Sequence, residues 1–505
     1  MSKDIYSYHI FIMPFRWEGE EHAQVRMDDI CKQLELRGCW EKIDYTQAAV
    51  SYINQDSRSL YAEKQYFHPY VQKAIYGGDE NVVANYAFRI EQNDKLNYII
   101  EKNDEVYKLL ISSIRIKVYN TGVALVSIHC ENHEYNDWKS IKAINDYGRR
   151  MALPFIPYDC TGSICADKIE IKSDNQADVD FSYDMKEIIN SFNNDNRIPE
   201  NRIGDYILQL LNFSLANDDR EIRQFGEEDI SADRKIIPIC PILDDRMYVM
   251  CLANKNGQNI VRNKNSLYEF LFIDCEGSIS CPNEEMRDSL LKERTYERWI
   301  QQWTIYGTLY GMTAHSFVEC SDFEPNINSF LTQYYQICCI VLAQRASLLN
   351  FKDEIMKLSF GVEERNKGID TKHTKWLMSL QERYIAYQNQ LDFFEISSQE
   401  QAIDIYEALR SANMIDKENE IFKNQLDNIY NAANVNLDYR LNVGGLAFAI
   451  AAIIIAFPSF LSDGSGIKIN AINWYFTFGL PALIVVVVFI IIKKAFGRKI
   501  KLKKR

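Results

Sequence analysis

Two long apolar stretches near the C-terminal end constrain this chain of 505 residues more than any other feature. Residues 441–462 contain no charged side chain, and neither do residues 469–492. At about 1.5 Å per residue, a helix of either length crosses the roughly 30 Å hydrocarbon core of a bilayer. Core helices of soluble proteins are seldom this long without a charged face. The sequence therefore predicts two transmembrane helices.

The charges around these stretches predict their orientation. Only residues 463–468 separate them, so both outer flanks lie on the same side of the membrane. Residues 493–505 carry eight Lys or Arg and no acidic residue. The positive-inside rule places this basic tail in the cytoplasm, together with the chain before the first span. We therefore expect a multi-pass protein of the cell inner membrane whose N-terminal body and C-terminal tail are cytoplasmic.

The body before the tail is acidic. Eight of the 57 basic residues and none of the 70 acidic ones lie in the tail, which leaves residues 1–492 with a net charge of −21. A field of this sign argues against direct nucleic-acid binding. The 12 cysteines form no C-x-x-C pair and are expected to be reduced core thiols, as the cytoplasm favours.

Strand and helix patterns alternate over residues 1–290, which predicts a cytoplasmic α/β (α+β) domain. The tripeptide Asn120-Thr121-Gly122 between two β-rich runs predicts a hairpin. The polar, Asn- and Asp-rich segment 172–200 predicts a loop. Strands are expected at residues 5–15, 82–90, 96–101, 111–119, 123–130, 236–253 and 271–274, and helices at residues 20–38 and 137–150.

Residues 291–440 change in character and predict a helical stalk region. Apolar residues recur there at helical spacing, from Tyr334 onward and again from about Thr371. A last helix is expected to begin near Ser397 or Ser398. No Gly or Pro interrupts it before Leu441, which predicts one continuous helix entering the first span.

Three segments and the overall layout carry a resemblance to a known family. A large α/β body, a stalk helix leading into the first of two C-terminal spans, a short outer loop and a basic tail resemble the CorA family of homopentameric divalent-cation channels. Segments 121–150, 296–318 and 334–351 are similar to a CorA-like subfamily found beside type III CRISPR systems. The resemblance implies a homo-oligomer, a pentamer, acting in the lipid membrane. It also implies an antiviral effector gated by a nucleotide second messenger that binds the cytoplasmic domain.

One motif of that family is missing. CorA transporters carry Gly-Met-Asn after the first span, whereas residues 457–464 read Phe-Pro-Ser-Phe-Leu-Ser-Asp-Gly here. Ion selectivity depends on the polar groups presented at the constriction. The absence weakens the alternative function, a divalent-cation transporter, and leaves a pore of other selectivity or a membrane-disrupting effector.

No catalytic motif stands out, which argues against an enzyme. The chain has no G-x-x-x-x-G-K-[ST], G-x-G-x-x-G, H-E-x-x-H or G-x-S-x-G pattern. His129 and His133 have the spacing of metal ligands, but no second ligand pair accompanies them. We therefore expect no catalytic residue, no metal site and no cofactor other than a nucleotide-type signalling ligand.

Two adjacent arginines are the first candidate for the ligand site. Arg149 and Arg150 close the predicted helix 137–150, next to Asn145 and Tyr147. Guanidinium groups bind phosphate through paired hydrogen bonds. The alternative is compensation of the helix dipole together with surface salt bridges. With the resemblance above, the arginines favour a small adenine-nucleotide-type ligand.

Aromatic side chains and glycines form a second candidate. Arg298, Trp299, Tyr310 and His315 lie within the segment 296–318, which also contains the pairs Tyr306-Gly307 and Tyr310-Gly311. Aromatic rings stack on bases, and glycines let a ligand approach the backbone. The alternative is a tightly packed bend in the core.

One face of the first predicted span contains the candidate pore-lining residues. Asn442, Leu446, Ala449 and Ile453 share this face at helical spacing. Asn442 could line a pore or donate a hydrogen bond to a neighbouring helix.

Overall fold

The computed structural model describes most of the body. The described residues are 5–17, 27–45, 57–78, 82–91, 94–153, 164–176, 179–195, 203–211, 214–215, 238–243, 246–254, 262–275, 281–298, 307–363 and 371–431. The predicted spans lie outside them, as do Asn442, Leu446, Ala449 and Ile453. Among the described residues, no helix has both the length and the apolar character of a membrane span.

The chain divides into two compact units. The first consists of Met1–Glu354 and Ser379–Phe422, and the second of Ile355–Met378 and Lys423–Arg505. The whole sheet and all contacts of the candidate site belong to the first unit, which the following paragraphs describe.

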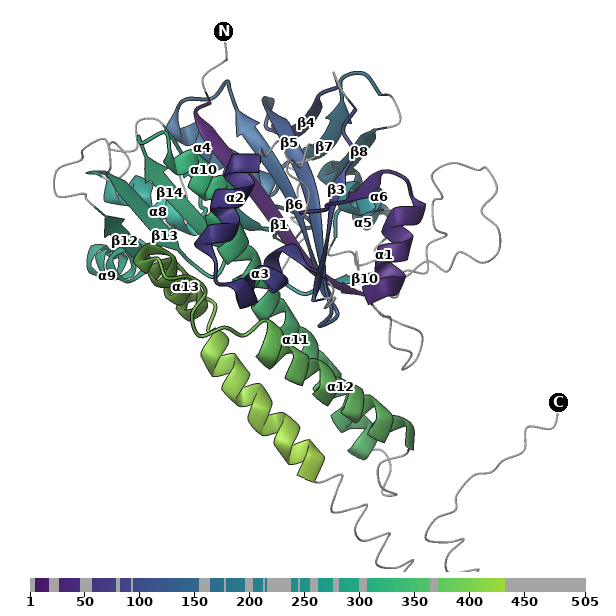
Figure 1. Cartoon of the computed structure of the whole chain (residues 1–505). Helices are drawn as coiled ribbons and strands as arrows, with labels where there is room; N and C mark the ends of the chain where they lie inside the picture. Colours follow the sequence, from purple (N-terminus) through teal and green to yellow (C-terminus); the bar gives the residue numbers. More distant parts are fainter. Residues whose placement is uncertain are drawn as a thin grey trace, which may run out of the picture. The chain divides into compact units, whose positions relative to one another are not determined.

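One mixed sheet is the centre of the first unit (Figure 1). In the described residues it has 14 strands, and its main path runs β12-β13-β14-β11-β1-β6-β5-β4-β7-β8. Neighbouring strands are antiparallel except in the pairs β11–β14 and β9–β10. The strands are β1 Ser7–Trp17, β2 Trp40–Lys42, β3 Val83–Phe88, β4 Leu96–Lys102, β5 Glu105–Tyr119, β6 Val123–Asn132, β7 Lys168–Ser173, β8 Asp180–Asp184, β9 Ser214–Leu215, β10 Pro238–Pro241, β11 Tyr248–Ala253, β12 Thr295–Arg298, β13 Thr308–Met312 and β14 Ser316–Ser321.

The described helices cover both faces of this sheet. On one face, Ile144 of α4 and Phe270 of α8 join a large apolar core with Phe11 of β1. On the other face, the ring of Tyr335 at the start of α11 packs edge-on against His129 of β6. The helices are α1 Met27–Leu36, α2 Ser57–Tyr66, α3 Pro69–Tyr76, α4 Trp138–Gly148, α5 Met185–Asp195, α6 Asp205–Leu211, α8 Lys264–Phe272, α9 Glu284–Arg294, α10 Asn326–Ser329, α11 Tyr335–Glu363, α12 Thr371–Gln390 and α13 Glu400–Ala412, with a π-helical turn, η3, at Phe330–Tyr334.

The centre of the sheet agrees with the sequence patterns. The hairpin of β5 and β6 is confirmed, and its turn residue Gly122 has a φ of 93°, which glycine adopts without strain. The described cysteines are free thiols, as expected, and Cys130, Cys251 and Cys320 are fully or almost fully buried in the sheet.

Three other predictions are wrong. Residues 172–200, predicted as a loop, contain β8, α5 and the end of β7. Residues 271–274, predicted as a strand, include the end of α8, because a short apolar run fits a buried helix end as well as a strand. Strands β12 to β14 extend the sheet beyond residue 290, so the predicted start of the stalk region falls inside the α/β domain.

The first half of α11 is attached to the sheet through buried hydrogen bonds. Ser127 Oγ of β6 lies 2.8 Å from the hydroxyl of Tyr335, and Thr121 Oγ1 lies 2.7 Å from Ser347 Oγ. All four side chains are buried. A buried polar group without a hydrogen-bond partner destabilises the folded protein, so these contacts favour one register of α11 on the sheet.

The predicted continuous stalk helix is wrong, because the helix breaks at Asn413 and Met414. α13 ends at Ala412, and the next helix covers residues 415–431. Met414 has a φ of 54°, a left-handed conformation that does not continue a right-handed helix. Asn413 Nδ2 donates to the carbonyl of Leu409 at 2.9 Å and closes the end of α13. Neither Gly nor Pro marks the break, so the sequence pattern did not indicate it.

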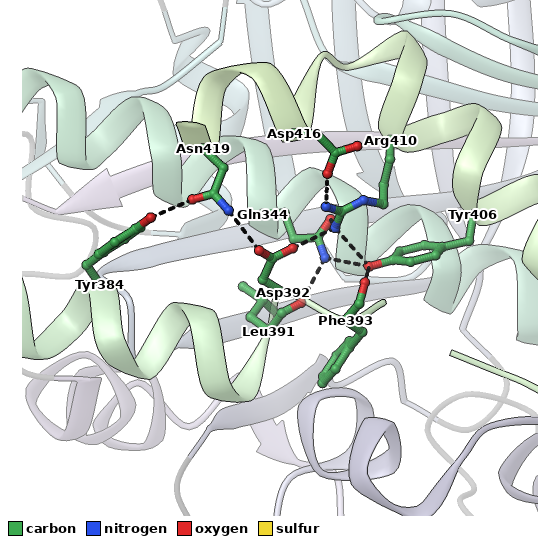
Figure 2. Close-up of polar contacts among 9 residues, drawn as sticks. All are labelled: Gln344, Tyr384, Leu391, Asp392, Phe393, Tyr406, Arg410, Asp416 and Asn419. Atoms are coloured by element: carbon green, nitrogen blue, oxygen red, sulfur yellow. Dashed lines mark hydrogen bonds and ion pairs between the residues drawn. The ribbon is translucent and has the colours of Figure 1, made fainter. Parts of the chain in front are cut away.

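Arg410 connects the two sides of this break (Figure 2). Its Nη1 donates to Asp392 Oδ1 at 2.7 Å, and its Nη2 pairs with Asp416 in the next helix. Asn419 donates to Asp392 Oδ2 and accepts from the Tyr384 hydroxyl, both at 2.8 Å. The network holds α12, α13 and the beginning of the next helix in one arrangement.

A buried carboxyl group lies near α13. Glu319 of β14 is fully buried, and neither of its oxygens has a hydrogen-bond partner among the described residues. It pairs in the sheet with Tyr310, whose hydroxyl accepts from Gln401 Nε2 of α13 at 2.5 Å. Burial raises the pKa of Glu319 well above its usual value of 4.5. Glu319 therefore keeps its proton in the folded protein at pH values where an exposed glutamate is ionised.

We expect Glu319→Gln to stabilise the protein, and more so as the pH rises. Below pH 4.5 the carboxyl group is protonated in both the folded and the unfolded protein. As the pH rises from 4.5 toward the raised pKa, only the unfolded chain ionises, so the free energy of unfolding falls. Gln keeps the shape and cannot ionise. Thermal melting of the full-length proteins should show similar Tm values near pH 5 and a higher Tm for the variant at pH 8. A lower Tm of the variant at both pH values would contradict this.

Candidate functional site

The candidate site lies at the C-terminal end of α4. The helix begins at its N-cap Asp137, whose carboxylate accepts from the backbone N–H of Ser140 at 2.8 Å. It ends at Gly148, where an added Cβ would lie 2.8 Å from the ring of Phe11 and 2.9 Å from Ile100. Glycine permits this close approach to the sheet, and the two arginines that follow are held against it.

Both predicted arginines are buried and share one carboxylate. Arg149 is 2% exposed and Arg150 is 5% exposed. The Nη2 atom of each lies 3.2 Å from Oδ1 of Asp146, which is also buried. Nη2 of Arg149 donates in addition to the carbonyl of Ile273, just after α8, at 2.8 Å. These are buried ion pairs and not the surface salt bridges of the alternative interpretation.

Positive charge is concentrated around this carboxylate. Burial lowers the pKa of Arg149 to about 10, Asp146 opposes that shift, and the nearby Arg150 and Arg246 add to it. Arg246 is brought here by an isolated β-bridge with Arg150, and Met247 N donates to the carbonyl of Arg149 at 2.7 Å. Guanidinium groups gathered in this way are well suited to phosphate oxygens.

Asn145 anchors α4 to the sheet. It is fully buried, and its Oδ1 lies 2.7 Å from His9 Nδ1 of β1. His9 Nε2 lies 2.8 Å from Ser7 Oγ, which accepts from Asn132 Nδ2 at 2.8 Å. Burial lowers the pKa of His9 to about 4, although the hydrogen bond to Asn145 opposes this. The imidazole is therefore neutral at physiological pH and serves to position the helix.

Tyr147 is the most accessible of the four candidates on α4. It is half-buried, its hydroxyl accepts from Cys275 Sγ at 3.4 Å, and Lys102 Nζ lies 5.6 Å from the centre of its ring. Burial raises the pKa of its hydroxyl, so the group stays protonated and can donate a hydrogen bond. An aromatic ring in this position is suited to stacking against a base.

The structure does not bring the second candidate group to the arginines. Tyr310 is buried on the sheet face that contacts α13, opposite the face covered by α4 and α8. His315 is exposed in the turn between β13 and β14. Arg298 ends β12, and Trp299 lies outside the described residues. The ligand role of all eight residues stays a prediction.

Sequence reasoning missed the partners of the arginines. Asp146 precedes them by three and four residues, a helical ion-pair spacing that could have indicated it. The buried ion pair between Lys142 of α4 and Glu269 of α8 joins residues far apart in the chain, and no sequence signal indicates it. Arg246 likewise comes to the site only through the strand pairing.

The two histidines with metal-ligand spacing do not lie together. His129 is buried against Tyr335, and burial holds its pKa well below the usual 6.5. His133 Nε2 lies 3.0 Å from Glu131. Among the described residues, no group of three or more His, Cys, Asp or Glu side chains could hold a metal ion.

Comparison with known proteins finds little similarity. No protein-family model and no curated protein matches the sequence. Among solved structures, the complete structure of the CorA magnesium transporter from Methanocaldococcus jannaschii matches with a TM-score of 0.18 and 11% sequence identity, over 52% of this chain and 95% of that chain. A likeness with this TM-score supports no argument about the function of this chain.

The neutral His9 predicts that acid loosens the anchor of α4. Its pKa is about 4 in the folded protein and 6.5 ordinarily, so its contribution to stability is complete above pH 6.5 and is lost as the pH falls toward 4. Denaturant unfolding of the full-length protein should show that the free energy of unfolding falls between pH 7 and pH 5, and His9 should account for about 2 kcal/mol of this decrease. His9→Gln should reduce this pH dependence, whereas His68→Gln, at a part-exposed position, should retain it. Equal pH dependence in the native protein and both variants would contradict this role of His9.

Proposed function

We propose that the chain is a membrane-anchored channel or membrane-disrupting effector, gated by an adenine-nucleotide-type second messenger that binds its cytoplasmic body. The setting that we propose is antiviral defence of the type III CRISPR kind. The observation that carries the proposal is the buried arginine cluster at the end of α4. The two predicted spans and the basic tail support the membrane part of it.

The arginine cluster supports an anionic ligand in two ways. Nε of Arg149 has no hydrogen-bond partner among the described residues, so a donor remains for an incoming oxygen. Arg149 and Arg150 also share a single oxygen of Asp146, whereas a phosphate group offers several oxygens to the two guanidinium groups. A phosphate bound here would therefore give Arg149 an additional acceptor.

In a homopentamer, each bound ligand has to supply only a small preference in binding free energy for the open state. Two spans per chain are too few to enclose a pore, which supports an oligomer. Moving a closed-to-open ratio from 99:1 to 1:99 takes about 5.5 kcal/mol of preferential binding to the open state. Shared over five sites, this is about 1.1 kcal/mol per site, which one charge-assisted hydrogen bond can supply.

We expect Arg149→Met and Arg150→Met each to weaken nucleotide binding about 10- to 150-fold, because each loses a charge-assisted contact of about 1.5–3 kcal/mol. Calorimetry with the full-length protein and a panel of adenine mono- and oligonucleotides measures this loss. Arg89→Met is the matched control, since Arg89 is an exposed arginine paired with Glu41. Dye release from vesicles containing the protein should require the same nucleotide.

Two results would contradict the proposal. If the native protein binds a nucleotide and both arginine variants bind it with the same affinity, the site assignment is wrong. If no nucleotide binds, and the vesicles instead take up Mg²⁺ or Co²⁺ without a ligand, the alternative of a divalent-cation transporter replaces the proposed effector.

A further inference from the structure

The turn between β13 and β14 has one internal hydrogen bond and is attached to β11 and to α8 by one hydrogen bond each. Within the turn, Thr313 N donates to the carbonyl of Ser316 at 2.9 Å. The carbonyl of His315 accepts from Val249 N at the start of β11 at 3.0 Å. Ser316 Oγ donates to the carbonyl of Leu271 in α8 at 2.5 Å. The turn therefore follows any movement of β11 or of the end of α8.

Arg149 is connected to both of these elements. Its carbonyl accepts from Met247 N, two residues before Val249, and its guanidinium donates to the carbonyl of Ile273, two residues after Leu271. A displacement of Arg149 consequently reaches the turn by two short routes, one through the beginning of β11 and one through the end of α8.

Arg345 of α11 joins the turn to the helix break. Its Nη1 donates to the carbonyl of Ala314 in the turn at 2.7 Å and to Oδ1 of Asn413 at 3.0 Å. Asn413 is buried and closes the end of α13. Arg345 is thus the side chain that contacts both the turn and the point where the helix changes direction.

The helix break is held in place by side-chain contacts. The left-handed backbone of Met414 is unfavourable for a residue with a side chain, so it persists only while its neighbours hold it. Arg345 holds the break through Asn413, and Arg410 holds it separately through Asp392 and Asp416. Loosening either contact should let the two helices change their relative direction.

We propose that Arg345 is a latch that couples the position of the 313–316 turn to the helix break at Asn413–Met414. Through it, a change at Arg149 alters how firmly residues 415–422, the start of the next helix, are held. Its use in gating rests on the function proposed above, whereas the coupling itself is a property of the fold and is measurable without a ligand.

Hydrogen–deuterium exchange on the full-length protein tests the coupling. The reporter is the set of amides of residues 418–422, the first of which, Glu418, donates to the carbonyl of Met414 at 3.0 Å. Arg149→Met should raise their exchange rate about threefold or more, and the Arg149→Met, Arg345→Met double variant should exchange no faster than Arg345→Met alone. Ser316→Ala, which detaches the turn from α8, replaces Arg149→Met if that variant does not fold.

Arg410→Met is the matched background. It loosens the break without touching the turn, so Arg149→Met should still raise the exchange rate in it, which shows that the reporter is not saturated. The proposal is wrong if Arg149→Met and Ser316→Ala leave the exchange rate of the reporter amides unchanged. It is also wrong if they raise this rate equally in the native protein and in Arg345→Met.

A second measurement separates the latch from the proposed function. Dye release from vesicles, with ATP as the probe nucleotide, should fall at least about tenfold in Arg345→Met while ATP binding stays within twofold of the native value. Should ATP neither bind nor trigger release, the proposed function loses its support from this probe, and the exchange experiment still decides whether the latch exists. Unchanged ATP-triggered release in Arg345→Met would overturn the gating role of the latch.

Discussion

One oxygen atom, Oδ1 of Asp146, holds two buried guanidinium groups in place, and the organisation of this corner depends on it. Arg149 also donates to the carbonyl of Ile273, but Asp146 supplies the negative charge between the two guanidinium groups, and removing it would leave two buried positive charges close together. Gly148 and Asn145 fix the helix from which this carboxylate projects. In the function proposed above, an incoming anion has to compete with Asp146 for the two guanidinium groups.

The sheet lies between this corner and the helices that lead away from the body. α4 and α8 cover one face, while α11 and α13 contact the other. The hydrogen bonds described above connect the two faces through the beginning of β11 and the 313–316 turn. β11, which pairs in parallel with β14, is the strand that connects Arg149 with this turn. Met247, just before β11, donates to the carbonyl of Arg149, and Val249 in β11 donates to the carbonyl of His315 in the 313–316 turn.

Sequence patterns were reliable where one physical effect dominates. The β5–β6 hairpin combines a clear turn signal with strongly apolar strands, and the pairing follows from it. The break at Met414 depends on tertiary contacts from Arg345 and Arg410, so local propensity favoured an unbroken helix. The arginine pair was visible in the sequence as a candidate, whereas its burial and its shared carboxylate depend on packing between α4 and α8.

The hydrogen bonds under the first half of α11 determine how this helix can move. If it slid along the sheet by one turn, Thr121 would lose its partner Ser347 and remain buried, at a cost of about 1–3 kcal/mol, and Ser127 would keep only His129. Tilting costs far less, because each hydrogen bond tolerates a modest change of angle. The contacts of the first half of α11 therefore oppose sliding of this helix along the sheet more strongly than they oppose tilting.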